Sequence, residues 1–137
     1  MRYNAVIDTN VVVSSMLKHD SIPGKIIDLV LVGVIKPLIN NEILAEYKDV
    51  LTRNKFDLKI CEVKDLLNKI KEAGIVLTKE QTIEKFIDQD DVVFYEIVMS
   101  ARNTMDAYLI TGNLRHYPIR SYVVTPKEMI DIIYNNN

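Results

Sequence analysis

The stretch Arg2-Tyr-Asn-Ala-Val-Ile-Asp-Thr-Asn10 decides the fold of this chain. Tyr3 to Ile7 is short and mostly apolar, which predicts a buried strand. Asp8, Thr9 and Asn10 follow directly at its carboxyl end. Open parallel α/β sheets bind their ligands just outside the carboxyl ends of the strands, so a carboxylate at this point suits a hard cation. Asp8 could instead only cap the helix that follows, and this stretch alone leaves both interpretations open.

The bulk properties of the chain restrict its class. At 137 residues it is long enough for a proper core, and we expect one domain over residues 1–137. The chain is 48% hydrophobic and 26% charged, as is typical of soluble globular proteins. Its formal net charge of -2 excludes an overall polycation, so any contact with nucleic acid requires a local basic patch.

Compartment is indicated by what the chain lacks. Cys61 is the only cysteine, which excludes an internal disulfide framework and fits a reducing compartment. No N-terminal segment has the charged and then apolar build of a signal peptide. The most apolar run, Ile26 to Ile35, is too short to span a bilayer. We therefore expect a cytoplasmic protein without membrane contact.

Short apolar segments alternate with helical patterns along the rest of the chain. Further strands are predicted at 34–39, 75–78, 107–111 and 122–125, and helices at 10–17, 25–32, 42–53, 61–73, 88–101 and 126–134. Three of these helices follow cap-type residues, namely Ser21, Asn40 and Thr125. The alternation implies parallel pairing, so we predict an α/β fold, a three-layer αβα sandwich with a central parallel sheet of about five strands. Pro37 lies inside the second strand and indicates an irregular or edge portion.

Acidic residues recur at places where they could face the edge of this sheet. In the helix at 42–53, Glu46 lies about 40° around the axis from Val50, at the margin of the buried stripe. Asp88-Gln-Asp-Asp91 opens a later helix with three acids, more than capping needs. Asp91 shares a face with the apolar residues of that helix, whereas Glu96 is expected to point away. A solvated acidic cap is the alternative interpretation of this cluster.

The order of these motifs resembles the PIN domain, and specifically the PIN-family toxin components of bacterial and archaeal toxin–antitoxin systems. The fourth motif is Ile110-Thr-Gly-Asn113, which follows the fourth predicted strand. The resemblance covers the chain from Arg2 to about Ile133. It implies a sheet ordered 3-2-1-4-5 and a metal-dependent ribonuclease that gathers three or four acids in one pocket.

Carried over residue by residue, the resemblance implies that Asp8, Glu46 and Asp91 are catalytic and hold Mg²⁺ or Mn²⁺. The fourth catalytic position is commonly Asp but is Asn113 here. This departure adds no negative charge and argues against tight binding of a second metal. Supporting positions are Asn10, Ser14, Asp88 and Asp90. Both cations prefer carboxylate and water oxygens. The implied reaction is in-line hydrolysis of an RNA phosphodiester by a metal-activated water.

Basic residues near these motifs are candidates for binding RNA. Arg53, Lys55, Arg115 and Arg120 could form a rim that binds phosphates, although for any one of them the sequence favours an ordinary surface charge. His116 could contact phosphate or shuttle a proton, but an ordinary loop histidine is the interpretation that the sequence favours. The resemblance further implies an RNA substrate, a separate antitoxin protein and a homodimer.

Two rival classes remain. A PIN-like domain without effective catalysis would serve as an RNA-binding or protein-interaction module, an alternative that Asn113 invites. A phosphoacceptor receiver-type domain is also doubly wound, but such a domain would need a phosphoacceptor Asp after the third strand. Here that strand ends Leu77-Thr-Lys79, which argues against it.

Overall fold

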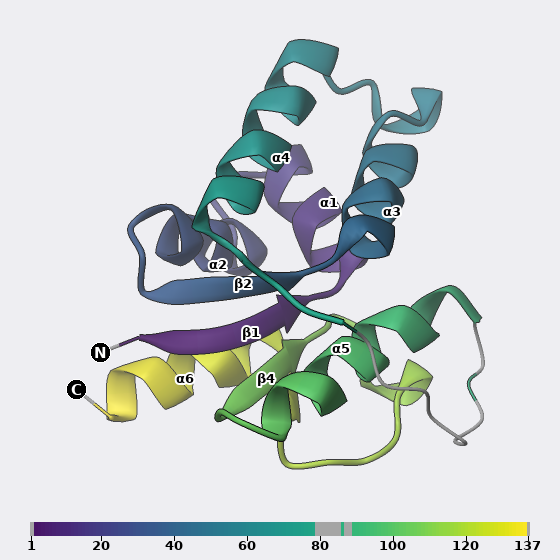
Figure 1. The fold of residues 1–137 in the computed structure, drawn as a ribbon. Coiled ribbons are helices and arrows are strands. Elements are labelled where there is room, and N and C mark those ends of the chain that lie inside the picture. The colour runs from purple at the N-terminus through teal and green to yellow at the C-terminus, as the bar shows by residue number, and fades with distance from the viewer. Residues whose placement is uncertain (1, 79–85, 87–88, 137) are drawn as a thin grey trace.

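A five-stranded parallel sheet forms the centre of the protein (Figure 1). The computed structural model describes residues 2–78, 86 and 89–136. The strands are β1 (Tyr3–Ile7), β2 (Ile35–Ile39), β3 (Ile75–Val76), β4 (Ala107–Ile110) and β5 (Val123–Val124). Their order is β3-β2-β1-β4-β5, which confirms the predicted topology. β1 therefore lies in the middle of the sheet, with its carboxyl end beside that of β4.

Helices cover both faces of the sheet. They are α1 (Thr9–Leu17), α2 (Ile22–Leu31), α3 (Asn41–Leu51), α4 (Ile60–Ala73), α5 (Val92–Arg102) and α6 (Pro126–Asn135), with the short 3-10 turns η1 (Asn54–Phe56), η2 (Gln89–Asp91) and η3 (Leu114–His116). Figure 1 shows α1 to α4 on one side of β1 and β2 and α5 on the other. This is the expected αβα sandwich. In the described part of the chain, no helix is long and apolar enough to cross a bilayer.

Local signals at the helix starts act as the sequence predicts. The Ser21 side chain accepts a hydrogen bond from the Gly24 amide at 3.1 Å, and the Asn40 side chain accepts one from the Ile43 amide at 2.8 Å. Thr125 and Glu128 form a reciprocal capping box at the start of α6. These caps fix where the helices leave the sheet.

Pro37 does not mark an edge strand, contrary to expectation. β2 is an inner strand between β1 and β3, and Pro37 is in register with Ala5 of β1. The pairing of β2 with β3 begins one residue later, at Leu38 opposite Ile75. Because β3 is only two residues long, the missing amide hydrogen of proline lies outside the ladder that β3 forms.

Glu96 also departs from prediction, because it is buried and only 5% exposed. It lines a hollow between α3 and α5 together with Glu42, Glu46 and Asp90. α5 contacts the sheet through β1, β2 and β4 and contacts α3 on another side. More of its circumference is therefore covered than a single apolar stripe implies.

Candidate active site

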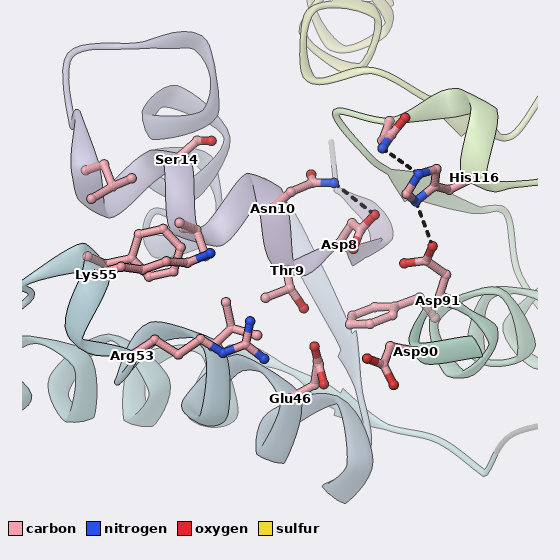
Figure 2. A pocket seen from close by; sticks show the side chains of 16 residues that line it. Asp8, Thr9, Asn10, Ser14, Glu46, Arg53, Lys55, Asp90, Asp91 and His116 are labelled. Atoms are coloured by element: carbon pink, nitrogen blue, oxygen red, sulfur yellow. Dashed lines mark hydrogen bonds and ion pairs between the residues drawn. The ribbon is translucent and has the colours of Figure 1, made fainter. Parts of the chain in front are cut away.

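An open pocket of about 480 Å³ lies where β1 and β4 end (Figure 2). Its lining comes from α1, α3, η1, η2, α5 and η3, and it comprises Asp8, Thr9, Asn10, Val13, Ser14, Leu17, Glu46, Val50, Arg53, Lys55, Phe56, Asp90, Asp91, Phe94, Asn113 and His116. The fold thus brings together nearly every site residue predicted from the sequence. Arg115 and Arg120 are exposed and do not line it. Asp88 lies outside the described residues.

Asp8 is held in the pocket by three side-chain donors. Its Oδ2 accepts hydrogen bonds from the Thr111 hydroxyl at 2.7 Å, the Tyr117 hydroxyl at 3.0 Å and the Asn10 side-chain amide at 3.3 Å. Asp8 occupies the N-cap position of α1, yet its side chain makes no capping bond there. Capping is therefore not what holds this carboxylate.

Two backbone bonds tie the Asp8 environment to the loop after β4. The Asn113 amide donates to the Thr111 hydroxyl at 3.0 Å, so that this hydroxyl accepts from the loop while it donates to Asp8. The Gly112 amide donates to Asn10 Oδ1 at 3.0 Å. A Cβ at Gly112 would lie 3.2 Å from that same oxygen, so a glycine keeps the approach open. The loop after β4 and the first turn of α1 therefore position each other.

Burial raises the pKa of Asp8 above its ordinary value of 3.8. The hydrogen bonds from Thr111 and Tyr117 act in the opposite direction, as does the nearby His116. The fold thus holds a carboxylate that is 4% exposed and costly to ionise. A bound cation would lower that cost directly.

Asp91 is held by residues of η3. Asp91 Oδ2 lies 3.0 Å from His116 Nδ1, and Asn113 Nδ2 lies 2.9 Å from His116 Nε2 (Figure 2). With the Asn113 amide donating, His116 Nε2 accepts and Nδ1–H donates to Asp91. His116 is therefore part of the site, rather than the ordinary loop histidine that the sequence favoured. Asp91 precedes α5 without capping it.

Tyr117 joins the two aspartates. Its hydroxyl is 3.0 Å from Asp8 Oδ2 and 3.4 Å from Asp91 Oδ1, and its side chain is buried. Burial and the two carboxylates raise the pKa of the Tyr117 hydroxyl, so it stays protonated and donates. This role was not predicted from the sequence. The only signal for it was a tyrosine in the short loop after the fourth strand.

The other predicted polar residues stand around the pocket wall. Glu46 is half-buried on α3, and Figure 2 shows it facing the same space as Asp8 and Asp91. Asp90 is exposed at the rim beside Glu46. Ser14, in the second turn of α1, lines the wall, but in the described part of the chain no side-chain bond joins it to Asp8.

The side of the pocket away from Asp91 is basic. Figure 2 shows Arg53 and Lys55 across from Asp91 and His116. Arg53 pairs with Asp49 at 3.1 Å on the outer surface of α3, and both side chains are largely exposed. The Lys55 Nζ lies 5.0 Å from the centroid of the Phe56 ring. The predicted basic rim is thus supplied by the 53–55 segment, and η3 contributes His116 in place of its arginine.

The donor set suits a hard divalent cation. Asp8, Glu46, Asp90 and Asp91 all present carboxylates to the pocket. The Thr9 hydroxyl, which is buried, has no hydrogen-bond partner among the described residues, although Thr9 lines the same pocket. A buried, unpaired hydroxyl calls for a water, an ion or a ligand. Among the described residues, no three His, Cys, Asp or Glu side chains lie close enough together to hold a metal ion. The described carboxylates thus share one pocket without forming a complete metal-binding group.

A family model described as PIN domain matches residues 4–115, which is most of the chain. The chain belongs to the PIN-domain family. The match confirms the predicted resemblance to the PIN domain, and the sheet order agrees with it. Members of the PIN-domain family are generally nucleases and commonly use divalent metals. A comparison with curated proteins gives no match.

The family match stops just before two residues that bond the aspartates of this PIN domain's pocket. His116 and Tyr117 follow the last matched residue, yet they bond Asp91 and Asp8. Thr111 and Thr9 lie inside the match and, like Tyr117, were not predicted to take part, whereas His116 was a candidate for phosphate contact. The acids of the site were recognisable from their motifs, whereas the hydroxyl groups around them were not.

Proposed function

We propose that this PIN domain is a Mg²⁺- or Mn²⁺-dependent endoribonuclease that cleaves RNA phosphodiesters with a metal-activated water. The observation that carries the proposal is the buried Asp8, whose Oδ2 is fixed by three donors while it shares a pocket with Asp91 and Glu46. A carboxylate oriented in this way and costly to ionise alone favours a cation ligand over a structural role.

Asp8, Glu46 and Asp91 would hold the metal, with Asn113 at the fourth position. When bound, the metal would lower the pKa of a water and neutralise charge on the scissile phosphate. The chain's own residues orient the ligands. Thr111 and Tyr117 hold one oxygen of Asp8, and among the described residues no side chain donates to the other, Oδ1.

The remaining polar groups bind and position the substrate. Arg53 and Lys55 supply positive charge at the rim, where they attract the phosphates on either side of the cleaved bond. His116 keeps a hydrogen on Nδ1 that donates to Asp91, which fixes the orientation of this carboxylate. The hydrogen bond from Asn113 sets the His116 ring in turn.

We extend the proposal to a biological role, the toxin of a toxin–antitoxin pair, on the likeness of the four motifs to PIN-family toxins. The proposed partners are an RNA substrate, a separate antitoxin protein and a second copy of the chain. A toxin is silenced by its antitoxin, so coexpression of the two should restore growth that the toxin alone arrests.

A second function, binding RNA or protein without effective cleavage, is favoured by one observation. Asn113 adds no charge at the fourth position, and its side-chain amide donates a hydrogen bond to His116. The acids therefore form no complete cluster among the residues described. This module would bind RNA at the basic rim and turn it over slowly or not at all.

Cleavage of a mixed pool of single-stranded RNA with Mn²⁺, Mg²⁺ or chelator tests the proposal. We expect metal-dependent cleavage by the wild type and its loss in Asp8→Asn. Asp106→Asn is the matched control, because Asp106 is exposed before β4, at the end of the sheet away from the pocket. RNA binding without metal-dependent cleavage would favour the module over the nuclease.

A further inference from the structure

The pocket has two chemically different ends. Asp8, Asp91 and His116 form one end, and Figure 2 shows Arg53 and Lys55 at the other. The apolar lining of the pocket consists of Val13, Leu17, Val50, Phe56 and Phe94, and Phe56 lies directly beside Lys55. A site that only hydrolysed a phosphodiester would need the acids and the cations, but not this apolar surface.

Phe56 and Leu17 are the main components of the apolar end. The Phe56 ring is half-buried against the core, and its turn η1 is closed by a bond from the Phe56 amide to the Arg53 carbonyl at 3.1 Å. Leu17, at the last turn of α1, is 53% exposed although it lines the pocket. An aromatic ring on a fixed turn and an exposed aliphatic side chain in the same pocket leave apolar surface for a flat ligand.

Lys55 and Arg53 define what kind of flat ligand fits. The Lys55 ammonium lies over the Phe56 ring, and Arg53 lines the same end of the pocket. A ligand that combines a flat apolar face with adjoining negative charge complements this arrangement. Nucleotides have this chemistry, since every base has a π face and is flanked by phosphates.

We infer that the apolar end is a nucleobase subsite, in which one unpaired base of an RNA strand stacks on Phe56 and takes the place of the Lys55 ammonium, which moves to a neighbouring phosphate. Leu17 packs on the base from α1, while Lys55 and Arg53 bind its neighbouring phosphates. A base inside a duplex cannot leave its stack without loss of pairing, so the substrate class is single-stranded RNA. The inference rests on the proposed function, because it takes RNA as the ligand.

The chain has no tryptophan, which permits a direct test with Phe56→Trp. The variant is titrated in chelator with a short single-stranded RNA, with the same strand in a duplex, and with a strand of abasic sites. We expect the fluorescence of the introduced indole to be quenched only by the intact single strand. Tyr134→Trp is the matched control, because Lys25 lies 4.8 Å from the Tyr134 ring centroid on α6, outside the pocket.

Affinity provides an independent readout. Phe56→Ala should weaken binding of the single strand roughly tenfold, because stacking of one base is lost. The dependence of affinity on salt should stay unchanged, whereas Lys55→Gln should reduce the slope against log salt by about 0.7. Phe56→Leu keeps apolar volume and loses the π face, so it should show the same loss even if the alanine variant folds poorly.

The outcomes separate this inference from the proposed function. Unchanged affinity in Phe56→Leu, or equal quenching of the Phe56→Trp variant by duplex and abasic strands, overturns the subsite while metal-dependent cleavage by the wild type still stands. Quenching of that variant by an added protein partner but not by RNA also overturns it, because the apolar end would then serve a protein side chain. A wild type that neither binds nor cleaves RNA overturns both.

Discussion

Replacing Tyr117 by Phe removes one hydroxyl and keeps the ring that packs in the core. That hydroxyl is the group that bridges Asp8 and Asp91, at 3.0 Å and 3.4 Å. Asp8 then keeps two of its three side-chain donors, Thr111 and Asn10. The buried carboxylate of Asp8 loses one of the hydrogen bonds that offset the cost of its burial. The variant should therefore be less stable in the absence of metal.

The size of the effect follows from the geometry. A hydrogen bond to a charged group contributes about 1.5–3 kcal/mol, and the longer contact at 3.4 Å adds little, so we expect a loss of about 2 kcal/mol. Unfolding entropy of about 2.1 cal/mol/K per residue gives about 0.29 kcal/mol/K for 137 residues. The melting temperature should therefore fall by about 7 °C.

Thermal unfolding followed by circular dichroism in chelator measures this shift. Tyr122→Phe is the matched control, because its hydroxyl contacts only the Tyr95 hydroxyl at 3.5 Å in the described structure and should move the melting temperature little. The Tyr117 bond also lowers the pKa of Asp8, so the loss should shrink at acidic pH, where Asp8 is protonated. A Tyr117→Phe protein that melts with the wild type at neutral pH would refute the bridging role.

Three further predictions concern Asp8 and Thr9. Asp8→Asn should abolish metal-dependent RNA cleavage and leave the metal-free protein equally or more stable, as activity assays and melts in chelator would show; retained cleavage contradicts the assignment. Because burial raises the pKa of Asp8 above 3.8, its folded state binds the proton more tightly, so stability without metal should fall as pH rises from 3.8 through the raised pKa. Melts of wild type against Asp8→Asn across that range should diverge only above pH 3.8. Thr9→Val should stabilise the metal-free protein by about 1 kcal/mol, since it removes a buried hydroxyl without a described partner, and should blunt the rise in melting temperature on adding Mn²⁺ or RNA. Thr9→Ser should behave like the wild type, and a destabilised Thr9→Val would contradict the prediction.

The cause expected for the effect of Asp8→Asn differs from the one that the motifs alone suggest. Crowded acids imply mutual repulsion, but the main cause of the raised pKa of Asp8 is its own burial. The acids stand around an open pocket and form no tight cluster among the residues described. The direction of the prediction is unchanged, yet it now depends on one residue rather than on three.

Much of the fold was predictable because it rests on local signals. The alternation of short apolar segments with capped helices indicates parallel pairing, whereas the order of the strands was implied by the resemblance to the PIN domain. Strand lengths were less predictable. β3 and β5 have two residues each, because their neighbours, not their own sequences, determine how far pairing extends.

The site was predictable where it depends on motif positions, and unpredictable where it depends on contacts between distant segments. Asp8, Glu46 and Asp91 follow from their places on strand and helix ends. Tyr117 and Thr111 act through bonds to a residue more than a hundred positions away, which no local pattern encodes. The prediction that Glu96 points away from the core failed for the same reason. α5 contacts α3 as well as the sheet, and Glu96 is buried.

The distance along the chain between Asp8 and its donors has a consequence for synthesis. Thr111 and Tyr117 lie 103 and 109 residues after Asp8, and both follow β4, the strand that pairs with β1 on one side. A nascent chain that has emerged only as far as α5 contains neither donor. It also lacks β4, which pairs with β1 on the side away from β2. The hydrogen bonds around Asp8 therefore cannot form until the chain has emerged from the ribosome beyond Tyr117, so under the proposed function a shorter nascent chain should not cleave RNA.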